Sequence, residues 1–166
     1  LGDKIGAAVL TPISKPDSNF HQNLMTLQEI VPPDQRGYAD ASIFVTTDWL
    51  AEHLDDPDIR VVDTNSPEEY EKAHIPGSVG VVDNYYKTSL EDRTHIQGPE
   101  QFAQTMSSLG ISDDTTVVAS DSHGGLYSLR LLWSLRYYGH ENLKMVDGGL
   151  PKWTAEGRPV SRDVPS

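Results

Sequence analysis

One loop collects side chains and backbone groups that could do chemistry. Asp121-Ser122-His123-Gly124-Gly125 follows the apolar, β-branched run 115–119 and precedes a long apolar segment that begins at Leu126. If these flanks are a strand and a helix, free N–H groups and the positive end of the helix dipole converge on the loop. Paired glycines let N–H groups surround a guest, so we expect a cradle for a small oxyanion. The alternative is an ordinary βα turn, with Ser122 or His123 as the helix cap.

None of the common catalytic or metal-binding patterns is complete around this loop. Ser122 lies between Ser120 and Gly124 and not in a G-x-S-x-G elbow, which argues against a serine hydrolase. Asp121 lacks the neighbouring carboxylate that an aspartyl-phosphate mechanism needs for Mg²⁺. The six histidines show no ligand-type spacing, and they stand at positions 21, 53, 74, 95, 123 and 140. We therefore expect no metal and no cofactor.

Composition excludes further classes of function. The 166 residues include 13 basic and 25 acidic side chains, a formal charge of −12, which argues against nucleic-acid or anionic-membrane partners. The length fits one domain, and no apolar run is long enough to span a bilayer. The chain has no cysteine, which removes disulfides, thiolate metal sites and any cysteine nucleophile. Cysteine usage therefore gives no compartment, and our working expectation is a cytoplasmic protein.

The elements that must position the loop alternate between strand and helix. Strands are predicted over 59–62, 79–82, 115–119 and 143–146, and helices after Thr46, after the capping box Ser66–Glu69, and over 99–109, 126–138 and 151–156. This alternation predicts an α/β fold with a parallel sheet and helices on both faces. Ligands of such folds bind beyond the carboxyl ends of the strands, here after Val62, Val82 and Ala119.

Several single residues have a structural interpretation as well as a functional one. Arg130, in the second turn of the long helix, is expected to face the loop or to pair with a carboxylate. His74 is expected to tie its turn together by hydrogen bonds. Trp133 and Trp153 are expected in the core. We also expect burial of the leucines of the long helix, at positions 126, 129, 132 and 135.

Three segments, in the same order, resemble the signatures of rhodanese domains. Glu68-Glu69-Tyr70 with 73–78 is similar to E-E-Y…G-H-I-P-G-A, and 136–140 is similar to L-R-x-x-G-H. The third segment, Asp147-Gly148-Gly149 through Trp153 to Val160, is similar to D-G-G-x-x-x-W-x-A-x-G-x-P, and the signature residues are His74, Pro76, Gly77, Asp147, Gly148, Gly149 and Trp153. The resemblance covers Ser42 to about Val160.

This resemblance implies a three-layer α/β/α domain with a mostly parallel five-stranded sheet. It also implies sulfur transfer from a donor such as thiosulfate or mercaptopyruvate to cyanide or a thiol, through a cysteine persulfide in the loop after the central strand. Here Asp121 stands at the cysteine's position, so the active-site loop, with Ser122, His123, Gly124, Gly125 and Arg130, is predicted to be vestigial. Asp121 and Arg130 are nine positions apart, further than the family's loop frame, and 63–65 lacks the arginine often found there.

Tandem sulfurtransferases account for these departures, because their first domain carries an aspartate where the second carries the cysteine. We therefore interpret 42–160 as a non-catalytic first domain, 1–41 as an arm or linker, and 161–166 as the start of an interdomain linker. The expected partners are a cysteine-bearing rhodanese domain in the parent chain and, in that parent enzyme, a small anionic sulfur donor. Isolated residues 42–166 are expected to be inactive.

Two alternatives stay open at this point. One alternative to the tandem interpretation is a stand-alone rhodanese-like domain that binds an anion or a partner. The other is an independent hydrolase that uses Asp121 or Ser122. Two further expectations concern the flanks: a short helix with the apolar stripe Phe20, Leu24, Leu27 and Val31, and an interface loop that runs from Tyr85 to Arg93.

Overall fold

The computed structural model describes residues 31–81 and 96–163. The chain divides into two compact units, Leu1–Tyr38 and Ala39–Ser166. In the first unit the short 3-10 helix η1 (Pro33–Gln35) is followed by Arg36, whose Nε donates to the Val31 carbonyl oxygen at 2.6 Å. Most of the predicted helix over 20–31 and the whole predicted interface loop lie outside the described residues.

The second unit is built on a five-stranded sheet in which every pairing is parallel. The strand order is β1-β5-β4-β2-β3, with β1 (Phe44–Val45), β2 (Ile59–Asp63), β3 (Val79–Gly80), β4 (Thr116–Ser120) and β5 (Leu143–Val146). The central pair β2 and β4 runs in register from Ile59 opposite Thr116 to Asp63 opposite Ser120. The predicted α/β class is therefore confirmed. β1 is only two residues long, which is too short for its hydrophobic pattern to reveal it.

Local sequence signals set the starts of the helices. The described part of the second unit contains the helices η2 (Ala41–Ile43), α2 (Thr47–Glu52), α3 (Pro67–Lys72), α4 (Pro99–Ser108), α5 (Leu126–Tyr137) and α6 (Gly149–Ala155). Thr46 caps α2 by accepting from the Trp49 N–H at 3.1 Å. Ser66 and Glu69 form the predicted capping box of α3, with both bonds at 3.3 Å. These caps stabilise the helix starts by about 1 kcal/mol each.

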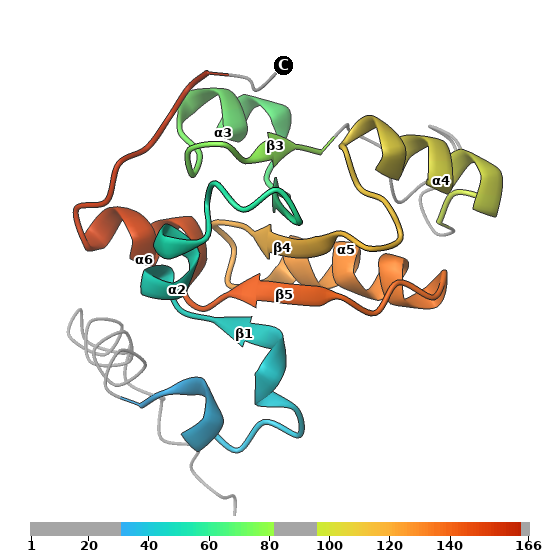
Figure 1. Cartoon of the computed structure of the whole chain (residues 1–166). Helices are drawn as coiled ribbons and strands as arrows, with labels where there is room; N and C mark the ends of the chain where they lie inside the picture. The colour runs from blue at the N-terminus through green and yellow to red at the C-terminus, as the bar shows by residue number, and fades with distance from the viewer. Residues whose placement is uncertain (1–30, 82–95, 164–166) are drawn as a thin grey trace, which may run out of the picture. The chain divides into compact units, whose positions relative to one another are not determined.

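The helices cover both faces of the sheet and give three layers (Figure 1). On one face, α4 and α5 pack Phe102, Met106, Leu131, Leu132 and Leu135 against Val62, Val117 and Ala119. On the other face, α2 and α6 pack Leu50, Leu150 and Trp153 against Val61, Val118 and Val146. No helix in the described ranges 31–81 and 96–163 is long and apolar enough to cross a membrane.

The predicted burial is wrong for three residues of α5. Leu132 and Leu135 are buried, but Leu126, Leu129 and Trp133 are exposed over 66%, 51% and 52% of their surface. α5 carries apolar side chains on both of its faces, so their spacing does not say which face meets the sheet. Trp153, by contrast, is buried as predicted, and its indole Nε1 donates to the Pro159 carbonyl oxygen at 2.6 Å.

Candidate functional site

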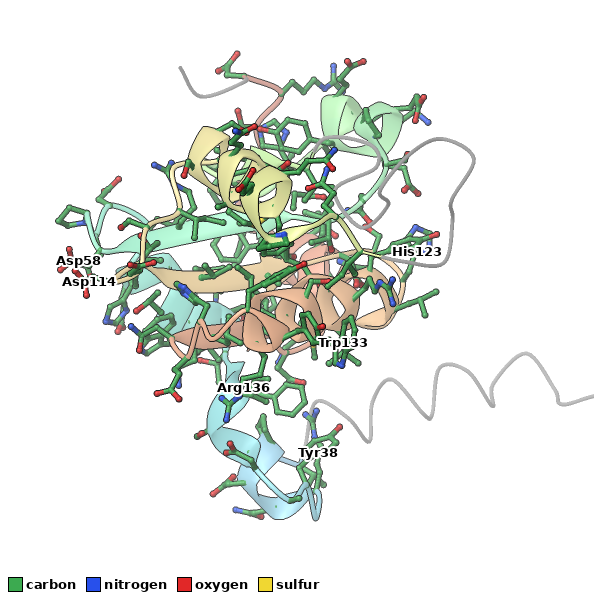
Figure 2. The ribbon with its side chains drawn as sticks, turned by 90° about the vertical axis from the view of Figure 1, so that its right-hand side faces the viewer. Tyr38, Asp58, Asp114, His123, Trp133 and Arg136 are labelled. Atoms are coloured by element: carbon green, nitrogen blue, oxygen red, sulfur yellow. The ribbon has the colours of Figure 1, made fainter. Side chains whose placement is uncertain are left out.

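The loops after β2 and β4 meet at the carboxyl edge of the sheet. Asp63 and Ser120 end these two strands as register partners, and the Thr64 N–H donates to the Ser120 carbonyl oxygen at 2.9 Å. In Figure 2, His123 marks this edge, whereas Asp58 and Asp114 mark the opposite, amino-end edge. The predicted loop 121–125 therefore lies where parallel α/β folds place their sites.

Asp121 fills the anion cradle with its own carboxylate. Oδ1 accepts from the N–H groups of His123 and Gly125, both at 2.9 Å. Oδ2 accepts from the N–H groups of Tyr127 at 3.1 Å and Ser128 at 2.9 Å, in the first turn of α5. The backbone cradle predicted from the sequence exists, but the carboxylate of this chain occupies it.

The cradle keeps this buried carboxylate ionised. Burial by itself raises the pKa of Asp121, but the N–H groups of Ser128, Gly125 and His123, together with the Ser128 side chain, bring it below its usual value. Each of these donors points at the charged form, and the positive end of the α5 dipole lies beside it. An aspartate held in this way is stabilised as an anion and is poorly placed to attack a substrate.

Two glycines let the loop take this shape. Gly125, the residue before α5, has a φ of +90°, in the left-handed region that favours glycine. Gly149 lies so close that a Cβ there would come within 2.2 Å of the Asp121 carbonyl oxygen. That oxygen accepts from the Leu150 N–H at 3.2 Å. The Asp147-Gly148-Gly149 signature thus serves to pack α6 against the loop.

Asn65 ties the β2 loop to the Asp121 loop. Its side-chain oxygen accepts from the Ser122 N–H at 2.8 Å, and its amide nitrogen donates to Ser122 Oγ at 3.4 Å. Nearby, the hydroxyls of Thr64 and Ser128 lie 3.3 Å apart. In the sequence, position 65 stands out only as the place of a missing arginine, and the predicted site residues do not include Thr64, Asn65 or Ser128. For Thr64 and Asn65, the signal that could have found them was their place directly after a buried strand.

Asp63 is a second buried carboxylate at the same edge. Its Oδ1 accepts from the Asn65 N–H at 2.9 Å, while its Oδ2 has no hydrogen-bond partner within the described part of the chain. The pKa of Asp63 is raised to about 6, mainly by burial and also by repulsion from Asp121, while hydrogen bonding to Asn65 opposes the rise. Two neighbouring carboxylates therefore have opposite pKa shifts.

His74 is completely buried and bonded at both ring nitrogens. Nδ1 lies 2.8 Å from the Tyr70 carbonyl oxygen and Nε2 lies 3.0 Å from the Asp163 carbonyl oxygen, while the ring stacks on Tyr70. His74 ties its turn together by hydrogen bonds, as predicted, and it also fixes the tail segment 161–163.

The side chains of His123 and Arg130 make contacts outside the cradle. The His123 ring is more than one third exposed, and it contacts Glu69 at 3.1 Å and the edge of Tyr127. The Arg130 guanidinium lies 5.3 Å from the centre of the Trp133 ring, on the outer face of α5. Within 31–81 and 96–163, no group of three or more histidine, aspartate or glutamate side chains could hold a metal ion. Ser122, His123, Gly124 and Gly125 lie in the same loop as Asp121, and the Arg130 guanidinium lies beside Trp133.

Comparison with known proteins identifies the family. The family profile described as "Rhodanese-like domain" matches residues 46–156. The chain belongs to the rhodanese-like family. The chain is 36% identical over 133 residues to the sulfur carrier protein TtuD of Thermus thermophilus. The aligned region covers 78% of this chain and 46% of TtuD. The chain is 38% identical over 134 residues to thiosulfate/3-mercaptopyruvate sulfurtransferase 2 of Arabidopsis thaliana, covering 72% of this chain and 38% of the plant protein.

A solved structure gives the same result. The crystal structure of the 3-mercaptopyruvate sulfotransferase SseA from Escherichia coli matches with a TM-score of 0.66 and 30% identity. The match covers 75% of this chain and 52% of SseA, so the chain spans about half the length of its relatives or less. This chain is thus a rhodanese-like domain, homologous to thiosulfate and 3-mercaptopyruvate sulfurtransferases, that contains no cysteine.

Proposed function

We propose that this chain is the non-catalytic rhodanese-like domain of a sulfurtransferase, and that it supports a second rhodanese domain that bears the cysteine. The parent enzyme would move sulfur from thiosulfate or mercaptopyruvate to cyanide or a thiol. The observation that carries the proposal is Asp121, which stands at the nucleophile position of the family and accepts four backbone hydrogen bonds.

The chemistry of that position supports a structural role. A carboxylate oxygen has no means of carrying a sulfane sulfur, and its negative charge repels an anionic donor. The N–H groups that would stabilise a developing anion already donate their hydrogen bonds to Asp121. The half-length match to the relatives fits a chain that works beside another domain. A cytoplasmic location stays a prediction.

The same geometry weighs against the other two hypotheses. An anion-binding domain would need free N–H groups in the loop, and four of them donate to Asp121. A hydrolase that uses Asp121 would need an accessible carboxylate, but Asp121 is 3% exposed. Ser122 has its N–H and hydroxyl both in contact with the Asn65 side chain, and no base is bonded to that hydroxyl in the described residues.

Sulfurtransferase assays test the proposal directly. The purified chain is mixed with thiosulfate and cyanide, and thiocyanate is measured as its iron complex. We expect no thiocyanate above a heat-inactivated control, with or without the Asp121→Ala substitution. Protein-dependent thiocyanate formation by the unmodified chain would overturn the proposal.

A second experiment tests the supporting role. The coding sequence is read beyond Ser166, and the protein it encodes is compared with its second half alone. We expect a rhodanese domain with a cysteine at the position equivalent to Asp121, and a lower melting temperature when that half is made without this chain. A continuation that contains no such domain would contradict the proposal.

A further inference from the structure

The outer face of α5 carries a row of large apolar side chains. Leu126, Trp133 and Tyr137 lie on one line along the helix together with Arg130, and Leu129 flanks them. Tyr137 is 64% exposed, more than Leu129 or Trp133. We call these five residues the α5 stripe. Single exposed apolar residues are ordinary, but a contiguous row on one helix is typical of an interaction surface.

A groove extends the stripe at the amino-end edge of the sheet. Leu129 and Trp133 line it on the α5 side, and Asp40, Ile43 and Lys144 line it on the β1 and β5 side. Figure 2 shows Trp133 and Arg136 standing along this side of α5. The stripe and the groove together form one face, which is larger than the stripe alone.

Charge distinguishes this face from the rest of the chain. The chain carries a formal charge of −12, which opposes the approach of a second copy at most surfaces. α5 has two arginines, Arg130 and Arg136, and no acidic residue. The groove adds Lys144 on the basic side and Asp40 and Glu141 on the acidic side. Charges of both signs around an apolar centre are what a self-complementary interface requires.

The position of the face favours a second copy over a domain that continues the chain. The tail segment 161–163 is bonded to His74 and Lys72, next to α3. The groove residues Thr116 and Asn142 lie at the amino ends of β4 and β5, opposite the Asp121 loop. A segment that follows Asp163 therefore starts away from the groove.

We propose that two copies of this chain associate through their α5 stripes in an antiparallel, two-fold symmetric dimer. The spacing of the stripe is self-complementary in this arrangement. When Arg130 of one copy lies opposite Trp133 of the other, Leu126 lies opposite Tyr137. The reason is that facing residues of two antiparallel identical helices have a constant sum of residue numbers, and these two pairs have the same sum. Each Trp133 ring then contacts a guanidinium on both sides, its own Arg130 at 5.3 Å and that of the other copy. This inference does not depend on the proposed function.

Sedimentation velocity of the full 166-residue chain tests the dimer, over a concentration range of roughly 1 µM to 1 mM. We expect the mass to rise from one chain to two with concentration. Trp133→Lys is expected to weaken the association at least tenfold, because it places a charge at the centre of the interface. Val160→Lys is the matched control, since Val160 is also exposed, at 45%, and the change in charge is the same. This variant is expected to dimerise like the unmodified chain.

Two results of this experiment would overturn the proposal. One is a single-chain mass for the unmodified protein at every concentration. The other is an equal loss of association in Trp133→Lys and Val160→Lys. That result would mean that the added positive charge weakens association wherever it is placed, and that the α5 stripe is not the interface. Circular dichroism of both variants shows whether they keep the fold, so a loss of folding is not mistaken for a loss of association.

Disulfide trapping tests the register. The chain has no native cysteine, so every disulfide that forms involves an introduced one. The double variant Leu126→Cys, Tyr137→Cys is expected to form a covalent dimer at least tenfold faster than either single variant. Within one helix these positions lie about 16 Å apart, too far for a disulfide, which needs Cα atoms about 4–7 Å apart. Equal rates in the single and double variants, or a faster reaction of Leu126→Cys alone, would exclude the antiparallel register.

Discussion

Asp121 and Asp63 are buried carboxylates at the ends of adjacent strands, yet their pKa values are shifted in opposite directions. Burial raises the pKa of both. Asp121 accepts four backbone N–H groups, whereas Asp63 accepts one from Asn65 and leaves Oδ2 without a partner in the described residues. The number of donors and the deeper burial of Asp63 act in the same direction, and together they decide which carboxylate stays charged at low cost.

The comparison also separates two kinds of loop. The loop after β4 enters a long helix, whose first N–H groups have no partner inside the helix. The loop after β2 reaches the short helix α3, and the Ser66–Glu69 capping box already uses N–H groups there. Asp121 is therefore surrounded by donors that need an acceptor, and Asp63 is not.

The largest effect is expected from emptying the cradle. Asp121→Ala leaves four N–H groups without their acceptor, and we expect the free energy of unfolding to fall by about 3 kcal/mol or more. Urea denaturation with and without sulfate measures this, since an anion that enters the empty cradle should restore part of the loss. A loss below about 1 kcal/mol would mean that the cradle contributes little to the fold.

Asp121→Asn is the matched control for this experiment. It keeps the shape of the side chain but replaces one acceptor oxygen with a donor and removes the charge. We expect a smaller loss than for Asp121→Ala, and no response to sulfate, because the amide still fills the cradle. A response to sulfate equal to that of Asp121→Ala would show that the anion acts elsewhere.

Substitution of Asp63 is expected to raise the free energy of unfolding, whereas substitution of Asp121 lowers it. The folded pKa of Asp63, about 6, lies above the value of about 3.9 in an unfolded chain, so its ionisation disfavours the folded state by up to about 3 kcal/mol above pH 6. Asp63→Asn removes this cost, and we expect a gain of about 1–2 kcal/mol at pH 7.5, because the amide still needs partners of its own. Denaturation at pH 7.5 and at pH 4 measures it.

The pH dependence separates the two carboxylates. The penalty at Asp63 disappears as the pH falls through about 6, so the gain from Asp63→Asn should shrink at pH 4. The pKa of Asp121 is lowered, so its contribution is present above about pH 4 and is lost as the pH falls through its folded pKa. A gain for Asp63→Asn that is the same at both pH values would contradict this account.

Asn65 links the two loops, and its removal is expected to have an intermediate effect. Asn65→Ala deletes the acceptor for the Ser122 N–H but keeps the backbone N–H that donates to Asp63. We expect a loss of about 1 kcal/mol. Amide hydrogen exchange should show faster exchange at Ser122 with little change at Gly125. Uniformly faster exchange of the whole loop would mean that Asn65 supports the cradle itself.

The smallest effect is expected at the outer rim of the loop. His123 contacts Glu69 through a pair that is more than one third exposed. We expect His123→Ala to change the free energy of unfolding by no more than about 0.5 kcal/mol, because solvent and salt screen exposed pairs. Denaturation at low and high NaCl measures it. A larger, salt-independent loss would show that the His123 ring acts through packing on Tyr127.

The sequence predicts those parts of this fold that depend on local chemistry. The capping box at Ser66 and Glu69 and the strand over 59–62 are local patterns, and both appear as predicted. The predicted burial of Trp133 is wrong because a helix that is apolar on both faces does not indicate which face meets the sheet. The choice depends on where β4 and β5 lie, which is tertiary information.

The site shows the same limit. The sequence predicts a backbone cradle after β4 and an aspartate beside it, but not that the aspartate folds back into the cradle. That outcome depends on the left-handed turn at Gly125 and on the close packing of Gly149 against Asp121. Asn65 was missed for a related reason, since its partner Ser122 is 57 positions away in the sequence.

The tail segment 161–163 is held to the domain at one place, next to the end of α3. Ser161 pairs with His74 through two backbone hydrogen bonds, and the Arg162 guanidinium donates to the Lys72 carbonyl oxygen. A pull on Asp163 would load these bonds and the Nε2 bond of His74 before it reached the sheet. The bonds to Lys72 and His74 therefore set the direction in which the chain runs at Asp163.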